Sequence, residues 1–266
     1  MNKILLIIFF TFIFIPESYA KNNSINNNPS NNLFQEIKYK YNVDIRYTRM
    51  GKYFPDYWIK QKIDIDFQEI DLNEVKRFPK LLDKALSTYS LNTIKKYLKN
   101  VNLFKSLYFY KTNYGATYDH NSIYMTSNGI KNNYTDSYLI NIFHHEFSSL
   151  LLMYNKFPEE EWKSWSPRGF KYNNGGLEAL KNNKYSLYGS DDLYKLGLLS
   201  EYSLASFEED FNVYSGLILE NPNNIYKLIK KYPYIKEKFK IWIKYYNSID
   251  PQISEKNLFK SFKYSD

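Results

Sequence analysis

The sequence predicts an α+β fold with a small mixed sheet, a central helix and a mostly helical carboxy-terminal half. Segments that alternate apolar and polar residues, the pattern of half-buried strands, end near Thr126. The segment from Thr135 to Tyr154 has helical spacing and is apolar on nearly every side, so we expect it in the centre of the fold. These observations place the sheet on the amino-terminal side of that helix.

The first half combines short strands with amphipathic helices. A helix is indicated where Val75, Phe78, Leu82 and Leu86 recur at helical spacing. The stretch Asn113–Gly115 is typical of a turn between strands. The expected order is strands at 41–47 and 63–70, helices at 71–89 and 93–98, and strands at 107–111 and 122–126. We expect about three to five strands in the sheet.

The second half is a series of helices separated by loops. Thr135 or Asp136 can cap the central helix, which we expect to end at Met153 or Tyr154. A loop that contains Trp, Pro and Gly follows at 162–176. Further helices are expected at 177–180, 192–196, 206–219, 225–231 and 235–246, with Pro233 interrupting the last two.

The first twenty residues have the features of a secretory signal peptide. Lys3 precedes an apolar run, and the run is followed by Ser18-Tyr19-Ala20, which fits the small-x-small cleavage rule. We therefore expect residues 1–20 to be removed and the product to be exported, whether periplasmic, attached to the cell surface or secreted. No stretch reaches the roughly 20 apolar residues of a transmembrane helix, so no transmembrane segment is expected.

The remaining chain is expected to form one domain behind a short leader. Residues 21–32 are almost all Asn and Ser and should be disordered, which leaves 33–266 as a single folded domain. The chain has no cysteine, so its stability must come from a core. The net charge of +8 could attract nucleic acid. However, the lysines are scattered and the chain should be exported, so we expect no nucleic-acid partner.

The most informative motif is His144-His145-Glu146 on the central helix. In the H-E-x-x-H pattern, two histidines four residues apart bind zinc and the glutamate activates the zinc-bound water. Counting from His145 the fourth position is Ser149, and counting from His144 it is Ser148, so neither register completes the pair. The chain has three histidines, so a metal site here needs carboxylates or His120.

A second group of candidate residues opens the helix at 206–219. Glu208, Glu209 and Asp210 are followed by apolar residues, so part of this acidic cluster should be drawn inward. The alternative is helix capping, because acidic residues in a first turn favour the helix dipole and Ser206 could be the cap. For His144 and His145 the alternative is a pair of core histidines. A neighbouring buried carboxylate at Glu146, however, would need a partner.

The order of these elements resembles the zinc metallopeptidases of gluzincin type, secreted proteins or lipoproteins associated with outer-membrane nutrient importers. The likeness spans about residues 43–216 and is carried by Tyr114–Asp119 (YGATYD), Phe143–Phe147 (FHHEF) and Glu209–Phe211 (EDF). The resemblance implies a zincin-like fold, in which a small mixed sheet packs on the central His-Glu helix. It also implies peptide or protein substrates and an association with outer-membrane import machinery.

The resemblance also assigns roles to residues. His145 becomes a zinc ligand, Glu146 the general base, Glu209 the ligand from the later helix and Asp210 a group that supports the ligands. Ser149 stands where the family has its second histidine, and a serine hydroxyl is a poor zinc ligand. The third donor would then be His144, Asp210 or a second water.

Two other residues near these motifs have weaker claims to a role. The Tyr202 hydroxyl could donate to a developing oxyanion, although it could equally be one of the many packed tyrosines. His120 follows a strand that could border the site, although its simplest interpretation is an exposed turn residue.

The sequence therefore supports two functions from different classes. The first is a zinc-dependent hydrolase, specifically a peptidase. The second is a catalytically inactive metallopeptidase-like envelope protein that binds peptide or glycan. A purely structural secreted domain is a third possibility. Both of the first two require His145 and Glu146 to face a cleft with Ser149 on the same wall, and Glu209 to lie within about 5 Å of the His145 ring.

Overall fold

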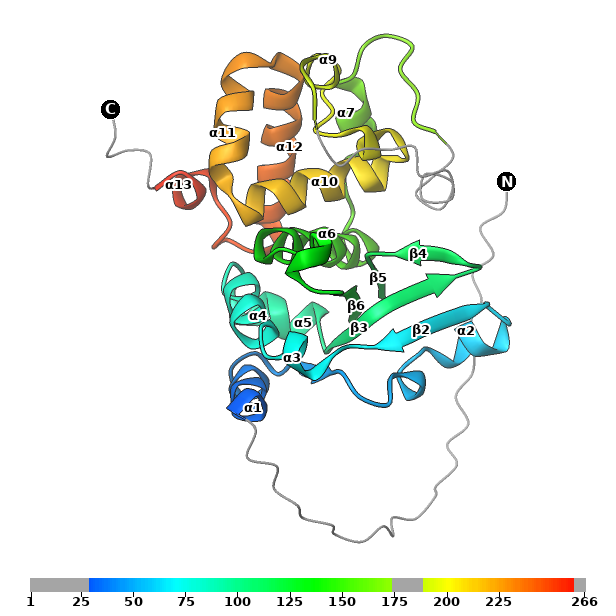
Figure 1. Ribbon diagram of the computed structural model, residues 1–266. Helices are drawn as coiled ribbons and strands as arrows, with labels where there is room; N and C mark the ends of the chain where they lie inside the picture. Colours follow the sequence, from blue (N-terminus) through cyan, green and yellow to red (C-terminus); the bar gives the residue numbers. More distant parts are fainter. Residues whose placement is uncertain (1–28, 174–188, 261–266) are drawn as a thin grey trace, which may run out of the picture.

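The computed structural model describes residues 29–173 and 189–260, in which a mixed sheet, a central helix and a layer of further helices follow one another (Figure 1). The strands are β1 (Asp44–Arg46), β2 (Ile65–Glu69), β3 (Asn100–Phe109), β4 (Thr112–Tyr114), β5 (Ala116–Asp119) and β6 (Ser122–Thr126). The helices up to the central one are α1 (Pro29–Tyr41), α2 (Asp56–Lys60), α3 (Leu72–Val75), α4 (Phe78–Leu86), α5 (Leu91–Tyr97) and α6 (Asp136–Tyr154). Those after it are α7 (Glu159–Ser164), α9 (Asp191–Lys195), α10 (Phe207–Glu220), α11 (Pro222–Lys231), α12 (Pro233–Ile249) and α13 (Glu255–Leu258). Short 3-10 helices lie at Met50–Lys52, Ile130–Asn132 and Glu201–Leu204.

The sheet is organised around β3, its longest strand. The first half of β3 lies between β1 and β6 and is parallel to both. Its second half pairs antiparallel with β2 and β4. Strand β5 pairs antiparallel with β6 and forms an edge of the sheet. The expectation of a small mixed sheet in an α+β fold is confirmed, although the six strands described here exceed the three to five expected.

Alternation along the strands divides the apolar side chains between two cores. Leu103, Ile123 and Met125 join the main core, which also holds the buried face of α6. Phe104 and Tyr124, their neighbours in sequence, point to the other face and pack with Trp58 and other aromatic residues. Successive residues of a strand point to opposite faces, so both faces of β3 and β6 are covered.

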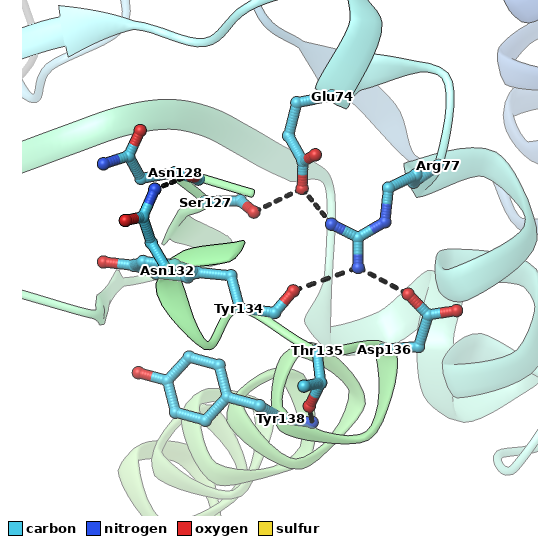
Figure 2. A network of polar contacts seen from close by, with 9 residues as sticks. All are labelled: Glu74, Arg77, Ser127, Asn128, Asn132, Tyr134, Thr135, Asp136 and Tyr138. Carbon is cyan, nitrogen blue, oxygen red and sulfur yellow. Dashed lines mark hydrogen bonds and ion pairs between the residues drawn. The ribbon is translucent and has the colours of Figure 1, made fainter. Parts of the chain in front are cut away.

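Helix α6 lies between the sheet and the helices of the second half (Figure 1). The hydroxyl of Thr135 accepts from the backbone N–H of Tyr138 and caps the helix, as the sequence predicts. Its start is fixed further by Arg77, which bonds Glu74, Asp136 and the carbonyl of Tyr134 (Figure 2). This network ties the first turn of α6 to α3 and α4.

The second half packs on α6 mainly through α10, and the two helices run in opposite directions. Ser137 donates to Glu220 near one end of the contact, at 2.8 Å. In the middle, a Cβ added at Gly216 would lie 2.7 Å from the side-chain oxygen of Asn141. It would also lie 3.0 Å from the backbone oxygen of Asn141, which cannot rotate away, so the distance between α6 and α10 depends on position 216.

Several expected elements differ from the structure in the first half. Residues 71–89 form two helices because Pro79, in the first turn of α4, cannot donate the N–H that would continue α3. Helix α1 was not expected. It begins at Pro29, inside the segment 21–32 for which disorder was predicted. The strand expected at 107–111 is the end of the longer β3, whose first residues include Asn100 and Asn102, a residue type depleted in strands. The turn before β4 lies at Tyr110 and Lys111, both with positive φ. Of the turn predicted at Asn113–Gly115, only Gly115 lies outside a strand, as the bend between β4 and β5.

The second half agrees more closely with the sequence. Helices α10, α11 and α12 lie within a few residues of the expected 206–219, 225–231 and 235–246, with Pro233 at the start of α12. Helix α7 falls in a segment predicted to be a loop. The helix expected at 177–180 lies outside the described residues. Within 29–173 and 189–260, no helix is long and apolar enough to cross a membrane.

Replacing Arg77 by Met should lower the free energy of unfolding by about 1.5–3 kcal/mol, because the largely buried Glu74 would lose its cation and the exposed Asp136 would lose a hydrogen bond to a charged donor. Chemical denaturation measures the change. The control is Lys195→Met, which removes only exposed ion pairs and should leave stability nearly unchanged. Equal effects of the two substitutions would show that the Arg77 network does not anchor α6.

Candidate functional site

The core of the candidate site is a direct bond between α6 and α10. His145 Nε2 lies 3.0 Å from Glu209 Oε2, and the two side chains are 17% and 18% exposed. The expected proximity of Glu209 to His145 is therefore confirmed. Because a carboxylate only accepts, Nε2 carries the proton of this bond. Solvent and ligands can reach the pair because both side chains are partly exposed.

The electrostatics of the site favour a protonated His145. Burial of the ring opposes its charged form, but the hydrogen bond to Glu209 and the charges of Glu209, Glu146 and Glu208 outweigh burial and raise its pKa. The pKa of Glu146 is raised to about 8, first by burial and then by the like charges of Glu209 and Glu208, while His145 partly offsets the shift. Glu146 is therefore mostly protonated at neutral pH in the absence of a ligand.

Ser149, at the position of the missing histidine, belongs to a separate hydrogen-bond network. Asn212 Nδ2 donates to Ser149 Oγ at 2.7 Å, and the side-chain oxygen of Asn212 accepts from Ser148. The Ser148 hydroxyl also lies 2.6 Å from the backbone carbonyl oxygen of His145, so its single proton is shared between the two acceptors. All three polar side chains are buried. The network fixes the turn of α6 that carries His145.

These donors do not complete a zinc site. Catalytic zinc is ordinarily held by three protein ligands, whereas His145 and Glu209 are two, and the Ser149 hydroxyl is neutral and bonded to Asn212. Among residues 29–173 and 189–260, no group of three His, Cys, Asp or Glu side chains is arranged to hold a metal ion. A metal would also have to displace the proton on His145 Nε2, which its raised pKa opposes.

Two tyrosines border the acidic groups. Tyr118, on the edge strand β5, donates to Glu208 Oε1 at 2.7 Å. The rings of Tyr202 and His145 have centroids 6.1 Å apart. Burial, the charges of Glu209 and Glu146, and a hydrogen bond to Glu209 together raise the pKa of Tyr202. Tyr202 therefore stays a neutral hydroxyl beside the pair, where it can donate to a bound group.

Asp210 lies on the other side of α10, away from His145. Its Oδ2 accepts from Lys238 Nζ at 2.8 Å, from Trp162 Nε1 at 2.9 Å and from the Tyr172 hydroxyl at 2.7 Å. Asp210 and Lys238 are both fully buried. The expectation that part of the acidic cluster is drawn inward is confirmed for Asp210. All three partners hold Oδ2, so Asp210 can orient α10 but has no contact with the His145–Glu209 pair.

The other two histidines have separate environments. His144 is fully buried and its Nδ1 lies 2.9 Å from the Tyr89 hydroxyl. Burial, and then the charge of Lys84, lower its pKa to about 3, so it stays neutral. His120 occupies the exposed turn after β5 and contacts Asp119 at 2.7 Å. The structure does not bring His144 or His120 together with His145 and Glu209.

Three residues that shape this site were not predicted from the sequence: Asn212, Tyr118 and Lys238. The spacing offers a signal for Asn212, since it lies three residues after Glu209 and therefore on the same face of α10. No comparable signal exists for Lys238, because its partner lies 28 positions away. Tyr118 lies within the YGATYD motif but received no role.

Comparison with known proteins gives one informative likeness. No family model and no curated protein matches the chain. A solved structure from Bacteroides caccae ATCC 43185, a "putative zinc-binding metallo-peptidase", is similar over 91% of this chain and 92% of that chain, with 18% sequence identity and a TM-score of 0.59. At this identity the likeness is one of fold. The chain has a metallopeptidase-like fold.

Substituting Lys238 by Met should lower the free energy of unfolding by about 3–5 kcal/mol, because Asp210 would keep a buried charge without its cation. The double variant Lys238→Met with Asp210→Asn removes both charges and should recover most of the loss. Lys163→Met, which breaks an exposed pair with Glu159, is the control. If the double variant were no more stable than Lys238→Met, an unpaired charge would not be the cause.

The Glu146→Gln variant should be more stable than the parent protein at alkaline pH. Folding raises the pKa of this carboxyl from 4.5 to about 8, so its stabilising contribution is complete below pH 4.5 and is lost as the pH rises to about 8. Urea denaturation should show little difference between the two proteins near pH 4.5 and a growing advantage for the variant up to about pH 8. A difference that does not change with pH would contradict the raised pKa.

Proposed function

We propose that this protein is an exported, metallopeptidase-like envelope protein that binds a peptide or glycan beside His145 without zinc-dependent hydrolysis of it. The observation that carries this proposal is the use of the Ser149 hydroxyl by Asn212. The position that would complete a zinc ligand set is thereby part of a buried hydrogen-bond network. His145 and Glu209 bond each other directly, which satisfies both groups without a metal.

The position of the site supports a binding role. His145, Glu208, Glu209, Tyr118 and Tyr202 are all partly exposed, whereas the network behind them is buried. A rigid buried layer beneath a partly exposed polar layer is the arrangement that holds binding groups in fixed positions. The edge strand β5 contributes Tyr118 to the same surface.

A second candidate, a zinc-dependent hydrolase, is favoured by a different observation. An imidazole and a carboxylate from two helices converge at 3.0 Å, and a carboxyl with a pKa of about 8 follows His145 in the sequence. In that function Glu146 would be the general base and Tyr202 the oxyanion donor, and the metal would have two protein ligands. Association with outer-membrane import machinery is proposed for either function on the basis of the sequence resemblance.

Restoring the missing ligand tests the proposal. Ser149→His should raise the affinity for zinc, because it adds an imidazole one helical turn from His145. Changes outside the ligand sphere alone alter metal affinity by about 10–100-fold, so a direct ligand should change it by at least that much. Competition with a chelating dye measures the affinity. The parent protein is expected to purify without stoichiometric zinc and to release no product from a peptide library.

Ser148→His is the matched control for this experiment. It places a new imidazole one turn from His144, which is bonded to Tyr89 and has no carboxylate from α10 beside it. Zinc affinity should stay at the parent level. Stoichiometric zinc in the parent protein, together with peptide turnover that chelation abolishes, would establish the hydrolase instead.

A further inference from the structure

We propose that the surface beside His145 selects a positively charged group, the ammonium of a basic peptide. This inference rests on the proposed function, since it takes the His145 surface as the ligand surface. It names the chemistry of the ligand, which the metallopeptidase-like fold does not specify.

The first support is the charge of the surface. Glu146 on α6 and Glu208 and Glu209 on α10 supply three carboxyl groups, whereas His145 is the basic side chain bonded to one of them. Within the described parts of the chain, no lysine or arginine pairs with any of the three. The whole protein carries a net charge of +8, so these carboxyl groups differ in sign from the chain as a whole. Because the screening length at physiological salt is about 8 Å, the nearest carboxyl groups dominate for a ligand in contact.

The second support is Glu146 itself. The residue is 8% exposed and has no hydrogen-bond partner among the described residues. Its charge acts on Tyr118, Tyr138 and Tyr202, which come from the strand and the helices that surround it. A buried carboxyl group without a partner is costly. A cationic ligand would supply the missing donors.

The third support is that two of the carboxyl groups are held in place by other side chains. An ammonium group directs three N–H donors outward and can bond acceptors that surround it. Glu209 is held by His145 and Glu208 by Tyr118, so these two acceptors are fixed in place before a ligand arrives. The tyrosine rings add aromatic faces, which also attract organic cations.

These features favour a peptide over a glycan, because a peptide carries ammonium groups on lysine side chains and at its amino end. Three pentapeptides distinguish the two sources. The first is acetylated and amidated polyalanine with a central lysine, the second has norleucine in place of lysine, and the third is the norleucine peptide with a free amino end. Isothermal titration with the purified protein at physiological salt gives each dissociation constant.

If the ligand group is a lysine side chain, the lysine peptide should bind at least about tenfold more tightly than the blocked norleucine peptide, as a charge-assisted hydrogen bond predicts. If it is the amino end of the peptide, the free-amine peptide should show this advantage. Glu208→Gln should remove most of this preference at physiological pH, and Glu146→Gln should remove most of it above about pH 8, where the Glu146 carboxyl is ionised. The matched control is Glu220→Gln, which neutralises a carboxylate at the other end of α10, where it bonds Ser137. It should leave the preference intact, and circular dichroism confirms that each variant is folded.

Equal binding of all three peptides, or binding of none, overturns the inference. So does a preference for ammonium that survives Glu146→Gln and Glu208→Gln, each at the pH stated for it. These outcomes differ from failure of the proposed function, which is decided by zinc content and turnover. A zinc-dependent hydrolase could still prefer basic peptides, and a non-hydrolytic protein could still bind neutral ones.

Discussion

The contact between α6 and α10 is the constraint on which the rest of the site depends. Gly216 lets the two helices approach until a side-chain atom at that position would overlap Asn141. At this separation His145 reaches Glu209, and Asn212 reaches both Ser148 and Ser149. The sheet supports α6 from one side and the helices of the second half support α10 from the other (Figure 1). A change in the distance between the helices would alter all of these bonds together.

The two faces of α10 serve different purposes. One face presents Glu209 to His145, while Asp210 on the other is bonded to Lys238, Trp162 and Tyr172. Adjacent residues of a helix differ in direction by about 100°, so fixing Asp210 also fixes the direction of Glu209. The cost of burying the charges of Asp210 and Lys238 is offset by their pairing and by the extra donors. The arrangement gives a rigid support to a partly exposed site.

The sequence predicts the local features of this protein well and its long-range contacts poorly. The start of α6 at Thr135 and that of α10 at Ser206 follow from capping residues whose effect is confined to one turn. The proximity of His145 and Glu209 was expected only through a family resemblance. The bond between Ser149 and Asn212, by contrast, requires the helices to be packed before the two residues meet, and neither residue type signals it. The first residues of β3 were missed because Asn100 and Asn102 are of a type depleted in strands, and their place in the sheet depends on the long-range pairing with β1 and β6.

The central claim is that His145 and Glu209 bond each other directly because the third zinc ligand is absent. The most direct test is a crystal structure of the parent protein grown with excess zinc, with diffraction recorded on both sides of the zinc absorption edge. The account predicts His145 Nε2 and Glu209 Oε2 at hydrogen-bond distance, near 3.0 Å, and no anomalous peak between them. A full-occupancy zinc peak bound to both side chains would contradict it.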